Sequence, residues 1–181
     1  MQSSIALGTS ELNVSKEINR TDAYDAIQKA SANHGIPEKY LLTMAAIESS
    51  YNPKAKNKKT GASGLFQFMP ATAREFGLSD NDCLDAKKSA DAAARLTKRN
   101  LSYLRKHGIN VDLNTNPEYG YLAHQQGAAG LTAIIKAAEN GTELSQGIRR
   151  NMDFNGGQGK TPKEFLDFWR RRYQLMAGRA K

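Results

Sequence analysis

The chain has 181 residues, 39% hydrophobic and 24% charged, which is typical of a soluble globular domain and excludes a disordered or fibrous chain. An excess of 26 Lys and Arg over 18 Asp and Glu gives a net charge of +8. This charge favours a polyanionic partner: nucleic acid, an anionic membrane or an anionic cell envelope. The single cysteine, Cys83, excludes an internal disulfide framework and a cysteine-rich metal site.

No apolar run approaches the roughly 18 residues of a membrane-spanning helix, so membrane insertion is not expected. The first eight residues lack the basic and apolar regions of a signal peptide. Proline, glycine and capping residues then divide the chain into predicted helices. In chain order these helices occupy residues 21–34, 38–50, 70–77, 84–107, 116–126, 128–140 and 161 onward.

The segments between the predicted helices contain few signs of a sheet. Residues 51–70 and 147–160 are basic and rich in glycine, which predicts two loops, and only residues 61–69 have any strand-like pattern. Residues 1–20 are predicted to be a polar N-terminal lead-in with weak periodicity. The expected fold is therefore mainly α, with one compact domain over residues 21–181.

One carboxylate stands where an apolar residue is expected. Leu41, Met44, Ala45 and Glu48 fall at i, i+3, i+4 and i+7, which is one stripe of the second predicted helix. A buried carboxylate must be paired or stay protonated with a raised pKa, and a protonated Glu near neutral pH can act as a general acid. The alternative is an ordinary Glu near a helix end, solvated or paired with a lysine of the next loop.

The loop that follows combines small, apolar and amide side chains. Glycines in residues 61–70 let the backbone approach another group closely, Phe66, Phe68 and Met69 offer apolar surface, and Gln67 offers an amide. Apolar walls with a few oriented polar groups are typical of a small-molecule cleft, including one for a sugar. The alternative is a tight turn whose side chains pack on the core.

Two segments in this region carry a resemblance to a known family. AIESSYNP, residues 46–53, and GASGLFQFMPATA, residues 61–73, resemble the soluble lytic transglycosylase family, which cleaves peptidoglycan. The resemblance is clear over residues 40–76 and weaker through residue 135. It implies a compact, single-domain, mainly α fold like that of goose-type lysozyme, with a short β-hairpin or loop region near the active site.

Other segments depart from the family pattern. AHQQG, residues 123–127, stands where the family has Ala-Tyr-Asn-Ala-Gly, and this variant resembles bacteriophage lysins more than bacterial housekeeping enzymes. Asn57 replaces a serine of many members. The tyrosine that many members carry in the last third has no counterpart, and Met152 and Phe154, which occupy that region, cannot donate a side-chain hydrogen bond.

The resemblance implies a mechanism with Glu48 as the only catalytic carboxylate. Glu48 protonates the glycosidic oxygen between N-acetylmuramic acid and N-acetylglucosamine, and then takes the proton from the C6 hydroxyl as a 1,6-anhydro ring closes. Gln67 and Gln125 are expected to bind N-acetyl groups, and no cofactor or metal is expected. The predicted substrate-binding residues are Ser63, Gly64, Phe66, Gln67, Phe68, Met69, Tyr121, His124, Gln125 and Gln126.

Further expectations concern the remaining reactive side chains. His34, His107 and His124 are widely spaced and form no metal-binding motif. Neighbouring Asp82 and Asp85 are expected to raise the pKa of Cys83 and make it a poor nucleophile.

The resemblance also implies partners and a location. The expected partners are peptidoglycan glycan strands and the anionic envelope, without nucleic acid, and the protein is expected to be a monomer. Because no signal peptide is recognised, we expect an antibacterial phage lysin, an endolysin or a virion component, that reaches the wall through a membrane lesion or aboard the virion. A goose-type muramidase that hydrolyses the same bond remains an alternative. A catalytically inactive wall-binding relative and a basic nucleic-acid-binding helical module are the others.

Overall fold

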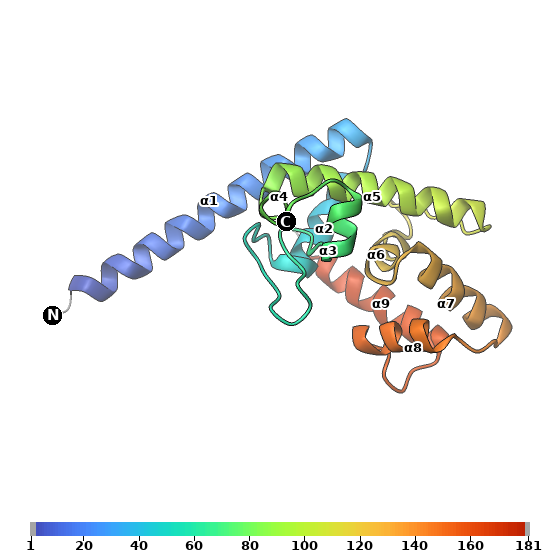
Figure 1. Ribbon diagram of the computed structural model, residues 1–181. Helices are drawn as coiled ribbons and strands as arrows, with labels where there is room; N and C mark the ends of the chain where they lie inside the picture. The colour runs from blue at the N-terminus through green and yellow to red at the C-terminus, as the bar shows by residue number, and fades with distance from the viewer. Residues whose placement is uncertain (1–2, 180–181) are drawn as a thin grey trace. The chain divides into compact units, whose positions relative to one another are not determined.

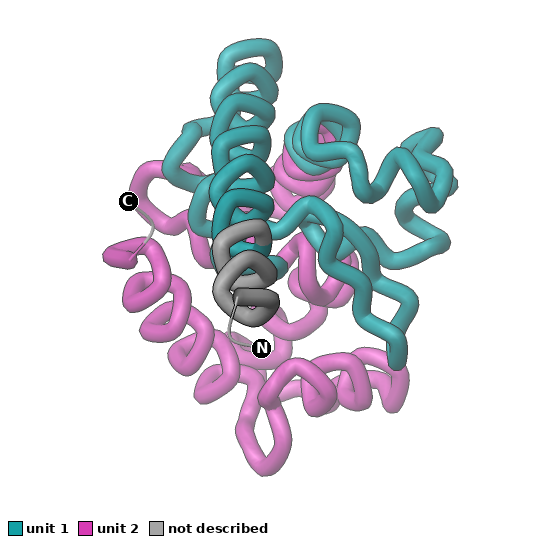
Figure 2. The backbone as a smooth tube through the Cα atoms, turned by 90° about the vertical axis from the view of Figure 1, so that its left-hand side faces the viewer, with its two compact units in different colours: residues 1–94 teal, residues 95–181 magenta. Residues whose placement is uncertain are grey.

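The computed structural model describes the backbone of residues 3–179 and the side chains of residues 12–179. Most of this chain is helical (Figure 1), which confirms the predicted mainly α class. The chain divides into two compact units, residues 1–94 and residues 95–181, coloured teal and magenta in Figure 2. Each unit is described by itself below.

The first unit contains two long helices and two short ones. These are α1 (Ser3–His34), α2 (Glu38–Ser49), α3 (Pro70–Glu75) and α4 (Asp80–Cys83), followed by the first turns of α5 (Ala86–Lys106). The ends of α1 and α2 lie within one residue of the predicted ends, at His34 and Ser49. The predicted loop between α2 and α3 is also confirmed, and pairing there is limited to two isolated bridges among the described residues, Lys56 with Ser63 and Ser63 with Phe68.

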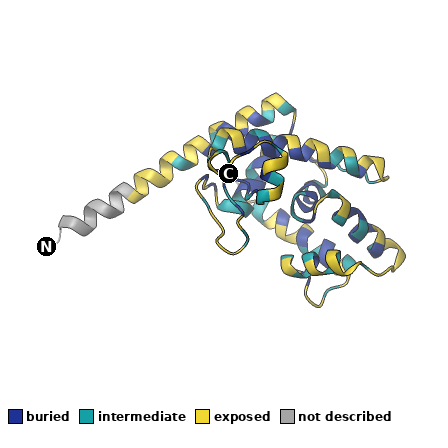
Figure 3. Cartoon of the chain, in the orientation of Figure 1, coloured by how far each residue is buried: buried dark blue, intermediate teal, exposed yellow. Residues whose placement is uncertain are grey.

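The predicted start of the first helix, at residue 21, is wrong. Helix α1 begins at Ser3 and includes the segment that was expected to be a lead-in. Adding turns to an existing helix costs little compared with nucleating one, so a helix can extend beyond the part that packs. Figure 3 shows this difference along α1: residues 12–22 are mainly exposed, whereas Ala23, Ile27 and Ala30 are buried.

The second unit is a cluster of short helices that follow the C-terminal turns of α5. It contains α6 (Pro117–Gln126), α7 (Ala128–Asn140), α8 (Gln146–Met152), a π-helix (Asp153–Gly157) and α9 (Pro162–Ala177). Helix α7 packs against both α6 and α9. The largest buried side chains of this unit include Leu104, Leu122, Leu131, Phe165 and Tyr173.

The predicted loop over residues 147–160 is also wrong, because α8 and the π-helix occupy most of it. The Arg149 guanidinium donates to the carbonyls of Lys160 and Gly157, at 2.9 and 3.3 Å, and pairs with Asp153 at 3.0 Å. The Arg149 side chain thus connects the beginning of this segment to its end. Glycine content alone does not reveal such a cross-link, since it reports only local backbone freedom.

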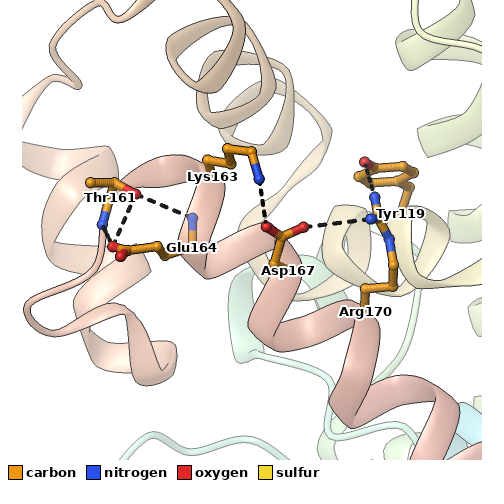
Figure 4. A network of polar contacts seen from close by, with 6 residues as sticks. All are labelled: Tyr119, Thr161, Lys163, Glu164, Asp167 and Arg170. Carbon is orange, nitrogen blue, oxygen red and sulfur yellow. Dashed lines mark hydrogen bonds and ion pairs between the residues drawn. The ribbon is translucent and has the colours of Figure 1, made fainter.

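Helix α9 begins with the predicted capping box (Figure 4). Thr161 Oγ1 accepts the Glu164 N–H at 3.2 Å, and Glu164 Oε2 accepts the Thr161 N–H at 2.8 Å. Further along, Asp167 pairs with Arg170 at 3.5 Å, and Arg170 donates to the Tyr119 hydroxyl at 3.0 Å. These contacts fix α9 against the first turn of α6.

Candidate active site

The structure confirms the stripe that carries Glu48. The side chains of Leu41, Met44 and Ala45 are completely buried on α2, whereas Glu48, on the same stripe, is half-buried in the last turn. The carboxyl is therefore neither sealed in the core nor fully solvated. This position suits a group that must exchange a proton with a bound ligand.

Helix α2 ends in a strained turn directly after Glu48. Ser50 and Tyr51 have φ of +52° and +64°, in the left-handed region that non-glycine residues rarely adopt. Their backbone N–H groups donate to the carbonyls of Ala46 and Ala45, both at 3.2 Å, which satisfies the end of the helix. Such strain persists only when the surroundings impose it, and it concentrates at functional sites.

An aromatic stack holds this turn. The Tyr51 ring is buried against Tyr24 of α1, with ring centroids 4.9 Å apart, and the Arg20 guanidinium lies 5.3 Å from the Tyr51 centroid. Burial raises the pKa of Tyr51 to about 12. Helix α1 therefore supports the turn that follows Glu48, a role that no sequence pattern indicated.

The loop between α2 and α3 is attached to α2 next to Glu48. Ser49 Oγ donates to the Leu65 carbonyl at 2.8 Å. Ser63 and Phe68 exchange two backbone hydrogen bonds, of 3.1 and 2.9 Å, which close a short hairpin turn over residues 64–67. The short β-hairpin or loop region predicted for this segment is thereby confirmed.

Close packing requires a glycine at position 64. Its φ is +83°, and a Cβ on this residue would lie only 1.7 Å from the carbonyl oxygen of Cys83. Its N–H donates to the Ala55 carbonyl at 2.8 Å. The close approach predicted for this glycine is to the protein's own backbone, and a contact with substrate stays a prediction.

Gln67 is the third non-glycine residue with positive φ among those described, at +46°. Its Nε2 donates to the carbonyls of Gly64 and Ala55, at 3.0 and 3.4 Å. Because carbonyl oxygens only accept hydrogen bonds, the amide nitrogen faces them and Oε1 is turned the other way. The three strained residues, Ser50, Tyr51 and Gln67, all lie in the two segments that carry the family resemblance.

The remaining predicted residues of this loop differ in exposure. Phe66 and Phe68 are 0% and 1% exposed, so their rings support the loop from the interior. Met69 is exposed at 47%, and Ser63 is half-buried. Of the apolar surface expected here, only Met69 is presented to solvent in the free protein, and contact of Phe66 and Phe68 with substrate stays a prediction.

The predicted residues of the second unit lie on α6. Tyr121 is buried, with its ring centroid 5.3 Å from that of Trp169, and His124 is half-buried one turn away. Gln125 Nε2 lies 3.5 Å from the Tyr121 hydroxyl, and Gln126 Nε2 donates to Gln125 Oε1 at 3.0 Å. The structure thus joins three of these four residues in one network.

One member of this network was missed by sequence reasoning. Asn151 of α8 donates through Nδ2 to Gln126 Oε1 at 2.9 Å. The spacing of Tyr121 and Gln125, one helical turn, is a usable local signal, but Asn151 comes from a different helix. No local pattern could have related it to Gln126.

The carboxylates near the loop are occupied by structural contacts. Asp82 completes a capping box at the start of α4 and pairs with Lys88, and the hydrogen bond from Lys88 is the main reason why its pKa lies well below the usual range. Asp85 accepts the Lys88 N–H at 2.9 Å. The pKa of the buried Cys83 is raised, as predicted, but the main cause is burial, and the contributing carboxylates are Asp80 and Asp82 in place of the predicted Asp82 and Asp85.

Two of the three histidines, His34 and His107, have structural partners. His34 pairs with Asp91 at 2.6 Å, and His107 Nδ1 lies 2.8 Å from the Tyr103 carbonyl. Within the described part of the chain, no three His, Cys, Asp or Glu side chains gather where they could hold a metal ion. No helix among the described residues is both long and apolar enough to cross a membrane.

The fold and the site define a helical domain with a half-buried carboxylate at a strained helix end. Residues 25–116 match the transglycosylase SLT domain family, and the match includes Glu48 and the whole loop. The chain belongs to this family, whose fold is lysozyme-like and mainly α.

Two curated relatives show similarity over shorter stretches. The soluble lytic murein transglycosylase of Escherichia coli K12 is 43% identical over 49 residues, which cover 27% of this chain and 7% of the relative. The peptidoglycan transglycosylase gp16 of Escherichia phage T7 is 38% identical over 78 residues, which cover 40% of this chain and 6% of the relative. The matches span less than a tenth of the length of either relative.

Proposed function

We propose that this protein is a peptidoglycan lytic transglycosylase, which cleaves the β-1,4 bond between N-acetylmuramic acid and N-acetylglucosamine. The observation that carries the proposal is the position of Glu48. It continues a stripe whose other members are completely buried, and a strained turn follows it. Membership of the transglycosylase SLT domain family supports the same activity.

In the proposed mechanism Glu48 acts first as an acid and then as a base. It protonates the glycosidic oxygen, and the acetamido group of the muramic acid stabilises the positive charge that develops at the anomeric carbon. Ionised Glu48 then accepts the proton of the C6 hydroxyl, whose oxygen closes the 1,6-anhydro ring. The sugar supplies its own nucleophile, so a second carboxylate to activate water is not required. This agrees with the structural contacts of Asp82 and Asp85.

The proposed substrate contacts come from side chains predicted from the sequence. Gln67 Oε1 accepts a hydrogen bond from an N-acetyl N–H, since its amide nitrogen is held by two backbone carbonyls. Gln125 is the second proposed partner of an N-acetyl group, and Met69 gives an apolar contact. The mechanism needs neither a metal nor a cofactor.

The location and partners are proposed on the same basis. A phage relative is named a peptidoglycan transglycosylase, which supports a phage lysin acting on the bacterial cell wall as an endolysin or a virion component. The net charge of +8 favours encounter with an anionic envelope, and this attraction weakens as salt increases. We propose that the protein acts as a monomer.

The test is digestion of purified sacculi followed by mass spectrometry of the released muropeptides. A transglycosylase releases anhydro products one water lighter than those of a muramidase. Glu48→Gln should lower the rate by at least about 100-fold, the low end of what a general acid contributes. Glu38→Gln, at the exposed start of the same helix, is the matched control and should digest at the wild-type rate. Hydrated products would indicate a muramidase, and full activity of Glu48→Gln would refute the role of Glu48.

A further inference from the structure

Two side chains of α1 that lie before the family-matched residues reach the turn that follows Glu48. The match to the transglycosylase SLT domain family begins at residue 25, and Arg20 and Tyr24 precede it. The Tyr24 ring stacks on the ring of Tyr51, with centroids 4.9 Å apart and planes 23° from parallel. The end of α2 is therefore in contact with a part of α1 that the family match does not include.

Arg20 connects the two stacked rings. Its guanidinium lies 5.7 Å from the centroid of Tyr24 and 5.3 Å from that of Tyr51, and it donates to the Tyr24 hydroxyl at 3.3 Å. A cation within about 6 Å of a ring centroid is attracted to the face of the ring. Arg20, Tyr24 and Tyr51 therefore form one cluster, the α1 clamp, in which a single cation orients both rings.

The turn held by the α1 clamp has a backbone that needs support. Ser50 and Tyr51 are consecutive non-glycine residues with positive φ, and each costs free energy in the left-handed region. Their N–H groups bond to the carbonyls of Ala46 and Ala45, so relaxation of the turn would open the end of α2. Burial of the Tyr51 ring against Tyr24 opposes this relaxation, because a stacked aromatic pair stabilises more than burial alone.

The position of the Glu48 carboxyl depends on this turn. Glu48 lies in the last turn of α2, two residues before Ser50, and helix ends without such bonds leave their carbonyls unsatisfied. A displacement of about 1 Å at a catalytic group can lower a rate by about 100-fold. We propose that Arg20 and Tyr24 are positioning residues, which fix the Glu48 carboxyl for proton transfer by holding the turn behind it. The inference rests on the proposed function, because it takes Glu48 as the general acid.

The first experiment compares Tyr24→Ala with Tyr103→Ala in the digestion of purified sacculi. Tyr103 also stacks on a side chain of its own helix or a neighbour, His107, with centroids 4.1 Å apart, but it lies on α5, so it is the matched control. Tyr24→Ala should lower kcat by about 10–100-fold and leave KM within about twofold of the wild type. Tyr103→Ala should change neither. Tyr24→Phe keeps the stacked ring and should restore kcat to within about twofold, and Arg20→Gln, which removes one cation–π contact, should lower kcat by about 2–5-fold.

The second experiment is amide hydrogen exchange, which does not depend on activity. The N–H groups of Ser50 and Tyr51 should exchange at least about tenfold faster in Tyr24→Ala than in the wild type, because the turn opens locally. The N–H of Met44, at the centre of the same helix, should exchange at the wild-type rate. Tyr24→Leu, which keeps an apolar side chain at this position, should show the same changes in kcat and exchange to a smaller extent, and it replaces Tyr24→Ala if that variant does not fold.

An active wild type in which Tyr24→Ala and Tyr103→Ala have the same kcat would overturn the inference and leave the proposed function intact. Unchanged exchange at Ser50 and Tyr51 would overturn it as well. Faster exchange with an unchanged kcat would mean that the α1 clamp is purely structural, which also contradicts the proposal. A wild type that releases no muropeptide refutes the proposed function, and the catalytic role of Glu48 with it, whatever the exchange rates.

Discussion

Replacement of Gly64 by Ala tests the packing of the loop beside Glu48. The new Cβ would lie 1.7 Å from the carbonyl oxygen of Cys83 and 2.8 Å from its carbonyl carbon, at a φ of +83°. The left-handed backbone costs an alanine about 1 kcal/mol, and overpacking against backbone that cannot rotate away adds about 1–3 kcal/mol. Gly64→Ala should therefore lower the free energy of unfolding by about 2–4 kcal/mol.

Gly77→Ala is the matched control for this change. Gly77 has a φ of +74°, but no atom lies within 4 Å of its would-be Cβ, so the substitution carries only the backbone cost. For a chain of this length 1 kcal/mol corresponds to about 2–4 °C in melting temperature. Thermal unfolding followed by circular dichroism should show Gly64→Ala melting about 4–16 °C below the wild type, and Gly77→Ala about 2–4 °C below. Equal melting temperatures of the two variants would refute the close contact with Cys83.

Two further predictions concern single side chains in each unit. Because burial raises the pKa of Tyr51 from 10 to about 12, the folded state holds its proton more tightly, and its contribution to stability is complete below pH 10 and lost as the pH rises to 12. Between pH 9 and about pH 12 the urea midpoint of Tyr51→Phe should fall less than that of the wild type. An equal fall in the two proteins would contradict this prediction. Arg170 pairs with the buried carboxylate of Glu118 at 3.2 Å, so Arg170→Ala should cost about 2–3 kcal/mol in urea unfolding. Glu118→Gln should cost less than about 1 kcal/mol, because it leaves the charge on the more exposed Arg170, and equal costs would contradict this asymmetry.

The parts of the fold that follow local rules were predicted well. The spacing of Leu41, Met44 and Ala45 predicts the buried stripe of α2. The capping box of Thr161 predicts the start of α9. Both depend on residues within two helical turns of one another, so the sequence contains the whole signal. The position of Glu48 on its stripe belongs to the same class of inference.

The errors arise where local signals are weak or are overridden. Residues 3–20 lack an apolar stripe, so hydrophobic periodicity does not predict the helix that they form. The glycines of residues 147–160 predict a loop, but Arg149 bonds to carbonyls up to 11 residues away and stabilises a helix and a π-turn instead. Phe66 and Phe68 have the composition of a binding surface, and only packing decides that their rings are buried.

The sequence by itself determined the family, the mainly α class and the acidic residue at the end of α2, because short motifs and helical periodicity encode them. The tertiary structure alone decided which way the amides point. Gln126 and Asn151 are 25 residues apart and come together through the packing of α6 and α8. The direction of a hydrogen bond between such residues depends on which donors and acceptors the fold places within about 3 Å of one another, and sequence spacing does not contain that information.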